Sequence, residues 1–305
     1  MSEQIEGAID AIDWPGSRPR LRAFVRRGLY PVCLGWVAAC IAYGLAHPEQ
    51  LVVVLAVKGG VLVGGLLLLE WLVPYRRLWR MTWRHLWRRD LVFIAINGAT
   101  LAGLSYGLVA LSIEVSAGTR GLITAWPLWS QVVVGLLAFE TLQYTIHRWM
   151  HTSRGAWGGW LWRTHAIHHL PQQLYVVMHA VFHPFNAIIV RLGVQLLPLW
   201  VLGYTPEAAF VFGSITALHG TFSHLNLDVR AGWLNYVFVG PELHRVHHAA
   251  DVPAGNYAAT LSIFDWALGT FHYQPGAPPR ALGLRRADGY PGQHEPLRAL
   301  ALPLG

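Results

Sequence analysis

The sequence predicts an all-α protein, a polytopic membrane bundle of four to six membrane-embedded helices with a histidine-rich helical cap on the cytoplasmic side. Three observations lead to this fold class. Apolar residues make up 54% of the 305-residue chain and charged residues only 13%, which lies outside the usual range of soluble proteins. Long apolar stretches recur along the chain, and arginines gather at the ends of these stretches.

The apolar stretches have about the length that a membrane span requires. A helix that crosses about 30 Å of hydrocarbon needs roughly 20 apolar residues. Six stretches come close to this length, at residues 29–47, 51–73, 91–113, 128–146, 186–203 and 206–222. The last two are short, so they either cross the membrane or form buried or re-entrant helices. Lys58 lies within the second stretch, and we expect its side chain to extend toward the membrane interface.

The placement of arginine predicts the orientation of the chain. Five arginines precede the first stretch, and residues 74–90 after the second stretch interleave six arginines with tryptophans, as in a helix that lies at the interface. The next turn, residues 114–121, carries only Arg120. By the positive-inside rule we expect the N-terminus, the region from 147 to 185 and the chain after 223 to be cytoplasmic, in a bacterial inner membrane.

Three segments follow from this organisation. Residues 1–28 form a polar cytoplasmic segment without the pattern of a secretory signal peptide, and 29–272 form one membrane-embedded domain whose histidine-rich region is 128–272. Residues 273–305, rich in Pro, Gly and Arg, are expected to form an extended cytoplasmic tail. Nucleic acid is not an expected partner, because the arginines mark the ends of spans and form no basic stripe.

Histidines are concentrated in one region and in three boxes. Twelve of the 16 histidines lie between residues 147 and 248, where the segments HRWMH (147–151), HAIHH (165–169) and HRVHH (244–248) stand out. Histidines four residues apart share one face of a helix, whereas adjacent histidines diverge by about 100°, so that one box can serve two ions. With His224 after the sixth stretch, the candidate metal ligands are His147, His151, His165, His168, His169, His224, His244, His247 and His248.

Ligand type alone leaves the metal open. Imidazole suits zinc, copper, iron and nickel. A zinc protease of the HExxH type is disfavoured, because Arg148 occupies the position of the catalytic glutamate. A b-type cytochrome is disfavoured as well, since the boxes lie at or beyond the ends of the spans.

The boxes and their flanks resemble the integral-membrane fatty acid hydroxylase and sterol desaturase superfamily, whose pattern is HxxxH, HxxHH and HxxHH. Similar flanking segments are ETLQYTIHRWMH, LWRTHAIHH, FHP at 182–184, LNYVFVGPELHRVHH and GNYAATLSIFDWALGTF, so that the resemblance covers roughly residues 128–272. It implies two non-haem irons held by the nine histidines, dioxygen as co-substrate and hydroxylation of a lipid C–H bond.

The resemblance also implies partners. The chain has no dinucleotide-binding GxGxxG fingerprint and no cysteine set for an iron–sulfur cluster, so two electrons must come from a separate reductase, ferredoxin or cytochrome. A lipid desaturase with the same di-iron site is the nearest alternative. A histidine-rich metal transporter is an alternative of another class, which would need polar ligands along a pathway through the spans.

Further polar residues are candidates for support of the metal ligands. Glu140 lies two helical turns before His147, and a carboxylate inside a span is costly enough to suggest a function, either as a ligand or as an acceptor that fixes a histidine tautomer. The other candidates, each with a purely structural alternative, are His183, His219, Asn226, Asn256 and Asp265.

Overall fold

The computed structural model describes residues 18–115, 121–275 and 279–305, and its regular elements in these ranges are all helices. The long ones are α3 (Leu29–Ala46), α4 (Leu51–Leu72), α6 (Leu91–Val115), α7 (Leu128–Thr152), α8 (Gly155–His169), the continuous run α9 (Pro184–Ile189), η5 (Val190–Leu196) and α10 (Leu197–Leu202), and α11 (Pro206–Ser223). Most of segment 1–28 and the turn with Arg120 lie outside the described residues.

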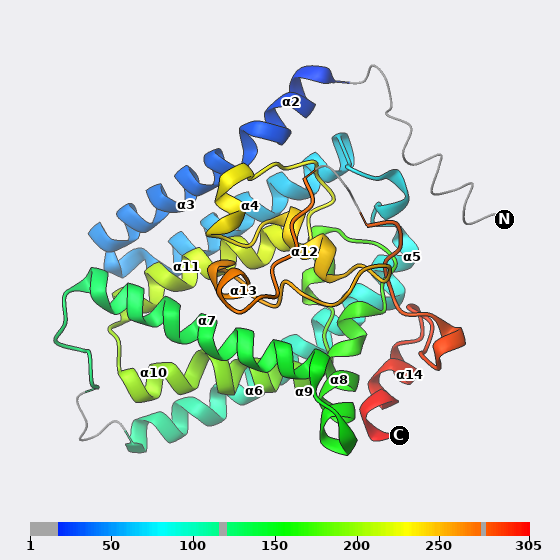
Figure 1. Ribbon diagram of the computed structural model, residues 1–305. Helices are drawn as coiled ribbons and strands as arrows, with labels where there is room; N and C mark the ends of the chain where they lie inside the picture. Colours follow the sequence, from blue (N-terminus) through cyan, green and yellow to red (C-terminus); the bar gives the residue numbers. More distant parts are fainter. Residues whose placement is uncertain (1–17, 116–120, 276–278) are drawn as a thin grey trace.

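Shorter helices connect and cover this bundle. They are α2 (Pro19–Arg27), η1 (Pro48–Gln50), η2 (Arg77–Trp79), α5 (Trp83–His85), η3 (Leu86–Asp90), η4 (Val176–Ala180), η6 (Gly232–Tyr236), α12 (Pro241–His247), α13 (Ile263–Ala267), η7 (Arg286–Asp288), α14 (Pro296–Ala301) and η8 (Leu302–Leu304). In Figure 1, α7 lies alongside α11, α8 follows the C-terminal end of α7, and α13 lies over the middle of α7.

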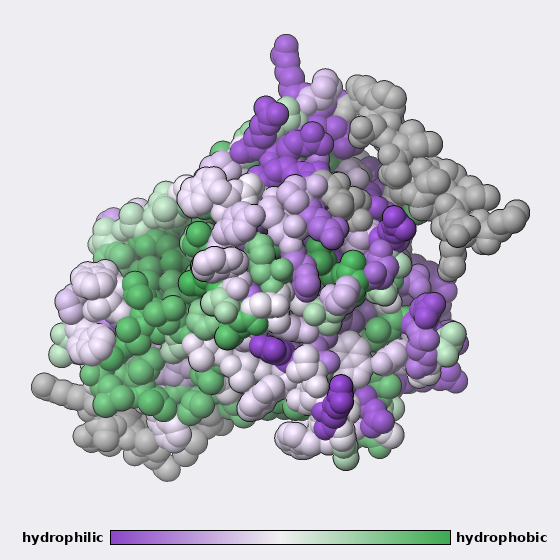
Figure 2. All heavy atoms as spheres, viewed as in Figure 1, coloured by the Kyte–Doolittle hydropathy of each residue, from purple (hydrophilic) through white to green (hydrophobic). Residues whose placement is uncertain are grey.

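The surface separates an apolar end from a polar end. Figure 2 shows apolar side chains over the end formed by α3, α7 and α10, whereas hydrophilic side chains cover α2 and the end that carries α5 and α14. Among the described residues, three helical segments are long and apolar enough to cross a membrane, namely Leu29–Ala46, Pro48–Leu72 and Pro184–Leu202. The expected all-helical membrane fold is confirmed.

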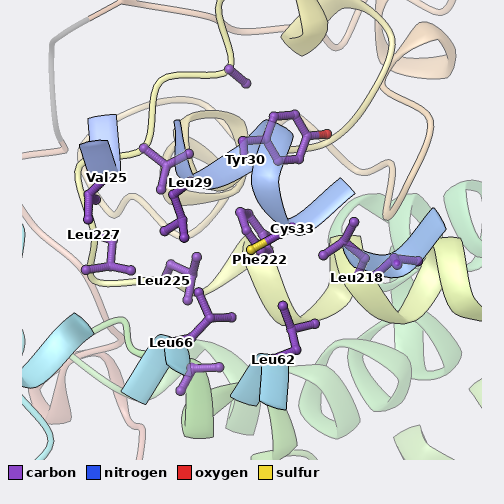
Figure 3. Close-up of a cluster of buried hydrophobic side chains, with 14 of the residues drawn as sticks. Val25, Leu29, Tyr30, Cys33, Leu62, Leu66, Leu218, Phe222, Leu225 and Leu227 are labelled. Atoms are coloured by element: carbon purple, nitrogen blue, oxygen red, sulfur yellow. The ribbon is translucent and has the colours of Figure 1, made fainter. Parts of the chain in front are cut away.

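The sixth apolar stretch forms a helix that is largely enclosed. In α11, Phe210, Phe212, Leu218 and Phe222 are buried against neighbouring helices, in agreement with the buried-helix alternative for this stretch. Phe222 and Leu218 join residues of α2, α3 and α4 in an apolar cluster, of which Figure 3 shows Val25, Leu29, Tyr30, Cys33, Leu62, Leu66, Leu225 and Leu227. This cluster fixes the position of the C-terminal end of α11, where His224 follows.

Lys58 does not extend toward the interface as the sequence suggested. Its side chain is only 5% exposed, and Nζ donates to Ser214 Oγ on α11 at 2.5 Å. Ser214 in turn donates to the carbonyl of Phe210. The expectation was wrong because α11 offers a hydroxyl acceptor at the depth of the ammonium, so a direct bond between helices replaces solvation by water or headgroups.

The C-terminal segment packs against the bundle and is not extended as the sequence suggested. Leu282 and Ala299 are buried in an apolar cluster with Trp79, Ile167 and Tyr175. Gln293 accepts from the buried guanidinium of Arg89 at 2.8 Å. Pro and Gly break the regular structure of this segment, but its few apolar side chains still bury enough surface to hold it in place.

Candidate metal centre

The structure brings the three histidine boxes and His224 to one place. The first box lies at the end of α7, the second at the end of α8 and the third on α12, while His224 caps α11. These four segments come from distant parts of the sequence and meet beside the polar end of the bundle. A placement of the boxes on opposite sides of the bundle, which a wrong number of crossings would have produced, is not observed.

The nine rings form two groups. In the five-histidine group one nitrogen from each ring lies within 4.8 Å of the others, and its members are His147, His151, His165, His169 and His247. In the four-histidine group the same holds for His168, His224, His244 and His248. The second and third boxes each contribute to both groups, as the angular spacing of their histidines predicts.

The distances between nitrogens fit ligands of a shared ion. Nε2 of His165 lies 3.0 Å from Nε2 of His147 and 3.1 Å from Nε2 of His169. In the four-histidine group, Nε2 of His224 lies 3.0 Å from Nε2 of both His168 and His244. Two nitrogens about 2.1 Å from one ion and at right angles to each other are about 3.0 Å apart, so the observed spacing suits a metal with several imidazole ligands.

Backbone carbonyls determine which ring nitrogen faces the centre. Nδ1 of His147 donates to Tyr257 O at 2.7 Å, Nδ1 of His247 to Gly255 O at 2.8 Å and Nδ1 of His168 to Val181 O at 3.1 Å. With its proton on Nδ1, each ring presents the lone pair of Nε2 to its group. Within the described ranges, the buried Nε2 atoms of His151 and His247 have no hydrogen-bond partner, so their lone pairs are available to a metal ion.

Burial keeps these rings neutral, the form in which imidazole binds metals. Desolvation lowers the pKa of His168 to about 3. The pKa values of His165, His169, His244 and His248 lie well below the usual value, first because of desolvation and then because neighbouring histidines would repel a second positive charge. At pH 7 the lone pairs are therefore available without competition from protons.

Glu140 supports the centre in a way that differs from both roles considered for it. It is completely buried and belongs to neither histidine group, and its carboxylate accepts from the backbone N–H groups of Ala259, Thr260 and Leu261. It thus fixes the segment 255–261, called the carbonyl loop below because it supplies the acceptors for His147 and His247. The sequence could not reveal this, since the partner loop lies 119 to 121 residues away.

Asp265 and Asn256 hold the same loop. Asp265 accepts from the N–H groups of Tyr257 and Ala258, and its pKa is raised by burial. Asn256 adopts a positive φ of 52° and its amide donates to Leu243 O, directly before the third box. Both residues therefore act on the histidines through the loop backbone.

The other three supporting candidates lie outside both groups. His183 caps α9 by accepting from Phe185 N–H, and its Nε2 lies 3.1 Å from Leu300 O. His219 contacts Tyr30 Oη at 2.9 Å. Asn226 exchanges hydrogen bonds with the backbone of Arg76, which ties the end of α11 to the end of α4. Their contacts are structural.

His179 is a residue near the centre that the sequence did not single out. Its ring lies 5.2 Å from that of His224, and burial lowers its pKa to about 4. Its buried Nδ1 has no hydrogen-bond partner among the residues that the structure describes. It precedes His183 by four residues, but η4 ends at Ala180 and α9 begins at Pro184, so the two do not share a helix face. Only the tertiary structure could place it here.

A cavity of about 870 Å³ lies against the centre. It extends along α11 from Ala209 to Ser223, with α6, α7 and the α9–η5–α10 run forming its other walls. Apolar side chains such as Phe139, Leu199 and Phe212 line much of it, and the histidines exposed to it are His147, His165, His168, His179, His224 and His244. The metal centre and a largely apolar cavity thus share a wall.

Comparison with known proteins identifies the segment that carries this centre. Residues 132–270 match the model of the fatty acid hydroxylase family. This segment is therefore similar to fatty acid hydroxylase domains. The match confirms the resemblance seen in the histidine boxes, and the matched residues contain all nine histidines of the two groups.

Two relatives extend the likeness beyond the domain. The chain is 32% identical over 217 residues to an ornithine lipid hydroxylase of Rhizobium tropici, a match that covers 68% of this chain and 64% of that relative. It is 25% identical over 224 residues to a very-long-chain aldehyde decarbonylase of Oryza sativa, covering 69% of this chain and 83% of the relative. The chain thus spans just under two thirds of the ornithine lipid hydroxylase. No solved structure matches it.

Proposed function

We propose that this protein is a membrane-bound di-iron oxygenase that hydroxylates a C–H bond of a lipid. The observation that carries the proposal is the arrangement of nine imidazoles in two groups, with Nε2 spacings of about 3 Å, against a cavity of about 870 Å³. An ornithine lipid hydroxylase among the relatives supports a lipid that carries an amino acid as the substrate class.

In this proposal the chain provides the metal ligands, orients the lipid and limits the access of water. The five-histidine and four-histidine groups would each hold one iron, and the carbonyls of Tyr257, Gly255 and Val181 keep Nε2 of their rings unprotonated. When bound, two irons supply the chemistry of dioxygen activation, in which one oxygen atom enters the C–H bond and the other leaves as water after uptake of two electrons and two protons. The cavity orients the lipid and limits the access of water.

The orientation in the membrane belongs to the proposal as well. The arginines of α2 and of residues 76–89 lie at the polar end of the molecule with the histidine boxes, which supports a cytoplasmic centre in an inner membrane. Two electrons per turnover come from a separate redox protein.

Lipid mass spectrometry tests the function directly. Cells that express the protein, compared with cells that express His168→Ala, should accumulate a lipid whose mass exceeds that of its precursor by one oxygen atom. A loss of two hydrogens would indicate a desaturase. Identical lipids in both strains, together with zinc in place of iron in the purified protein, would contradict an oxygenase and favour the transporter alternative.

A further inference from the structure

A basic pocket lies beside the second histidine box and shares no lining residue with the cavity described above, called the lipid cavity below. It has a volume of about 440 Å³ and is lined by Arg84, Arg88 and Arg286 together with residues 291–295 of the C-terminal segment. Leu170, which directly follows the second histidine box, also lines it. The pocket therefore reaches the backbone of the box from the surface.

The pocket keeps a net positive charge. Arg84 and Arg88 are exposed on neighbouring turns of the α5–η3 helix and have no hydrogen bond or ion pair within the described ranges. Glu295 is the one carboxylate among the lining residues, and it pairs with Arg286. Its charge is thus neutralised locally, and the two free guanidinium groups attract an anionic partner.

An aromatic path leads from the rim of this pocket to the five-histidine group. Tyr290 directly precedes Pro291 of the pocket wall, and Trp162 Nε1 donates to its hydroxyl at 2.7 Å. The Trp162 ring lies 5.1 Å from the His151 ring and 5.7 Å from the His169 ring. Electron tunnelling falls steeply with the width of gaps between atoms, so a continuous path of contacts is favoured over one through solvent.

We propose that the basic pocket docks an acidic one-electron carrier of the ferredoxin class, and that Tyr290 and Trp162 conduct its electrons to the five-histidine group. The inference rests on the proposed function. Each of two reduced [2Fe–2S] carriers loses one electron, and the two electrons reduce the two irons from the ferric to the ferrous state. Neither aromatic residue changes its bonds, because both act only as a medium for tunnelling.

Positive charge and position favour a protein carrier over a lipid headgroup. The pocket ends at the second histidine box, whereas the tryptophans that would enter the membrane interface, Trp83 and Trp87, are exposed without lining it. A carrier that docks here reaches the centre through Trp162 without crossing the lipid cavity. Electron delivery and lipid oxidation then use two separate pockets.

Binding tests the docking surface independently of catalysis. The full-length protein in nanodiscs should bind a reduced acidic [2Fe–2S] ferredoxin, and the Arg84→Glu/Arg88→Glu variant should bind it about ten-fold more weakly, with the difference shrinking at high salt. The matched control is Arg20→Glu/Arg27→Glu, which removes the same charge from exposed positions of α2. Equal affinities of the two variants for the ferredoxin would overturn the docking surface. The docking surface would also be overturned if Arg84→Glu/Arg88→Glu weakened binding to anionic lipid vesicles but not binding to the ferredoxin.

Stopped-flow reduction of the iron-loaded protein tests the path. Trp162→Phe should slow reduction by the ferredoxin several-fold at an unchanged iron content, and Tyr290→Phe should slow it less. Trp160→Phe, on the same helix but stacked on Trp157 away from the centre, should leave the rate unchanged. A wild-type rate in Trp162→Phe, or loss of iron from it, would overturn the path. Lipid hydroxylation by wild-type protein with dithionite as reductant would show that the proposed function stands apart from this result.

Discussion

The two histidine groups differ in ligand number and in what surrounds them. In the four-histidine group, His168, His224 and His244 line the apolar cavity, whereas in the five-histidine group only His147 and His165 do. The five-histidine group instead contacts Trp162 and Tyr257 and is supported by the carbonyl loop. In the proposed function the four-histidine group therefore has more contact with the substrate cavity, and the five-histidine group has more contact with surrounding protein.

Loss of a ligand from the smaller group should have the largest effect. His168→Ala leaves three imidazoles in the four-histidine group, and the removed ring lies on the cavity wall. Loss of a residue that supports a metal ligand typically lowers activity by up to about 100-fold. We expect loss of the ligand itself to lower the rate of hydroxylation by more than this. Mass spectrometry of lipid products measures the effect, with membrane insertion verified by fractionation. Activity near that of wild type would remove the second box from the centre.

Loss of a ligand from the larger group should cost less. His151→Ala leaves four imidazoles in the five-histidine group, as many as the other group has in the native protein. We expect iron to be retained at a reduced affinity, with a loss of about 10-fold to 100-fold in activity. Iron analysis of the two variants side by side is the measurement. Equal loss of iron from His151→Ala and His168→Ala would break the proposed difference between the groups.

Substitution of Glu140 should disturb the five-histidine group through the carbonyl loop. Glu140→Ala leaves three buried N–H groups of the carbonyl loop without an acceptor, and the free energy of unfolding should fall by about 3 kcal/mol. Because the loop orients His147 and His247, iron should leave the five-histidine group first. Glu140→Gln, which keeps one acceptor oxygen, serves as the milder control. Thermal unfolding and iron content that match wild type in both variants would contradict this role.

The pH dependence of the metal-free protein tests whether the buried rings are neutral. The folded-state pKa of His168, about 3, lies below that of a free histidine, so folding is favoured at a pH above about 6.5 and loses stability as the pH falls below it. His179, with a pKa of about 4, contributes in the same direction. Thermal unfolding in detergent at pH 7.5 and 5.5 should show a lower midpoint at pH 5.5. A higher midpoint at the acidic pH would contradict neutral buried rings.

The sequence predicted the helices and the histidine ligands better than their support, for a physical reason. Histidines four apart on a helix report their shared face through local geometry, so His147 and His151 could be paired from the sequence alone. Glu140 and the carbonyl loop meet only in the folded chain, and backbone carbonyls have no signature in the sequence. The same holds for His179, which stands on a different helical segment from His183. Lys58 was misplaced because its partner, Ser214, comes from a distant helix.

The metal content of the purified protein tests the central claim most directly. Protein produced with iron and measured by elemental analysis should contain two irons per chain, and Mössbauer spectra should resolve two inequivalent sites, one for each histidine group. A single iron per chain, or two zinc ions with no consumption of dioxygen under reducing conditions, would contradict the assignment of the nine histidines to a two-iron centre.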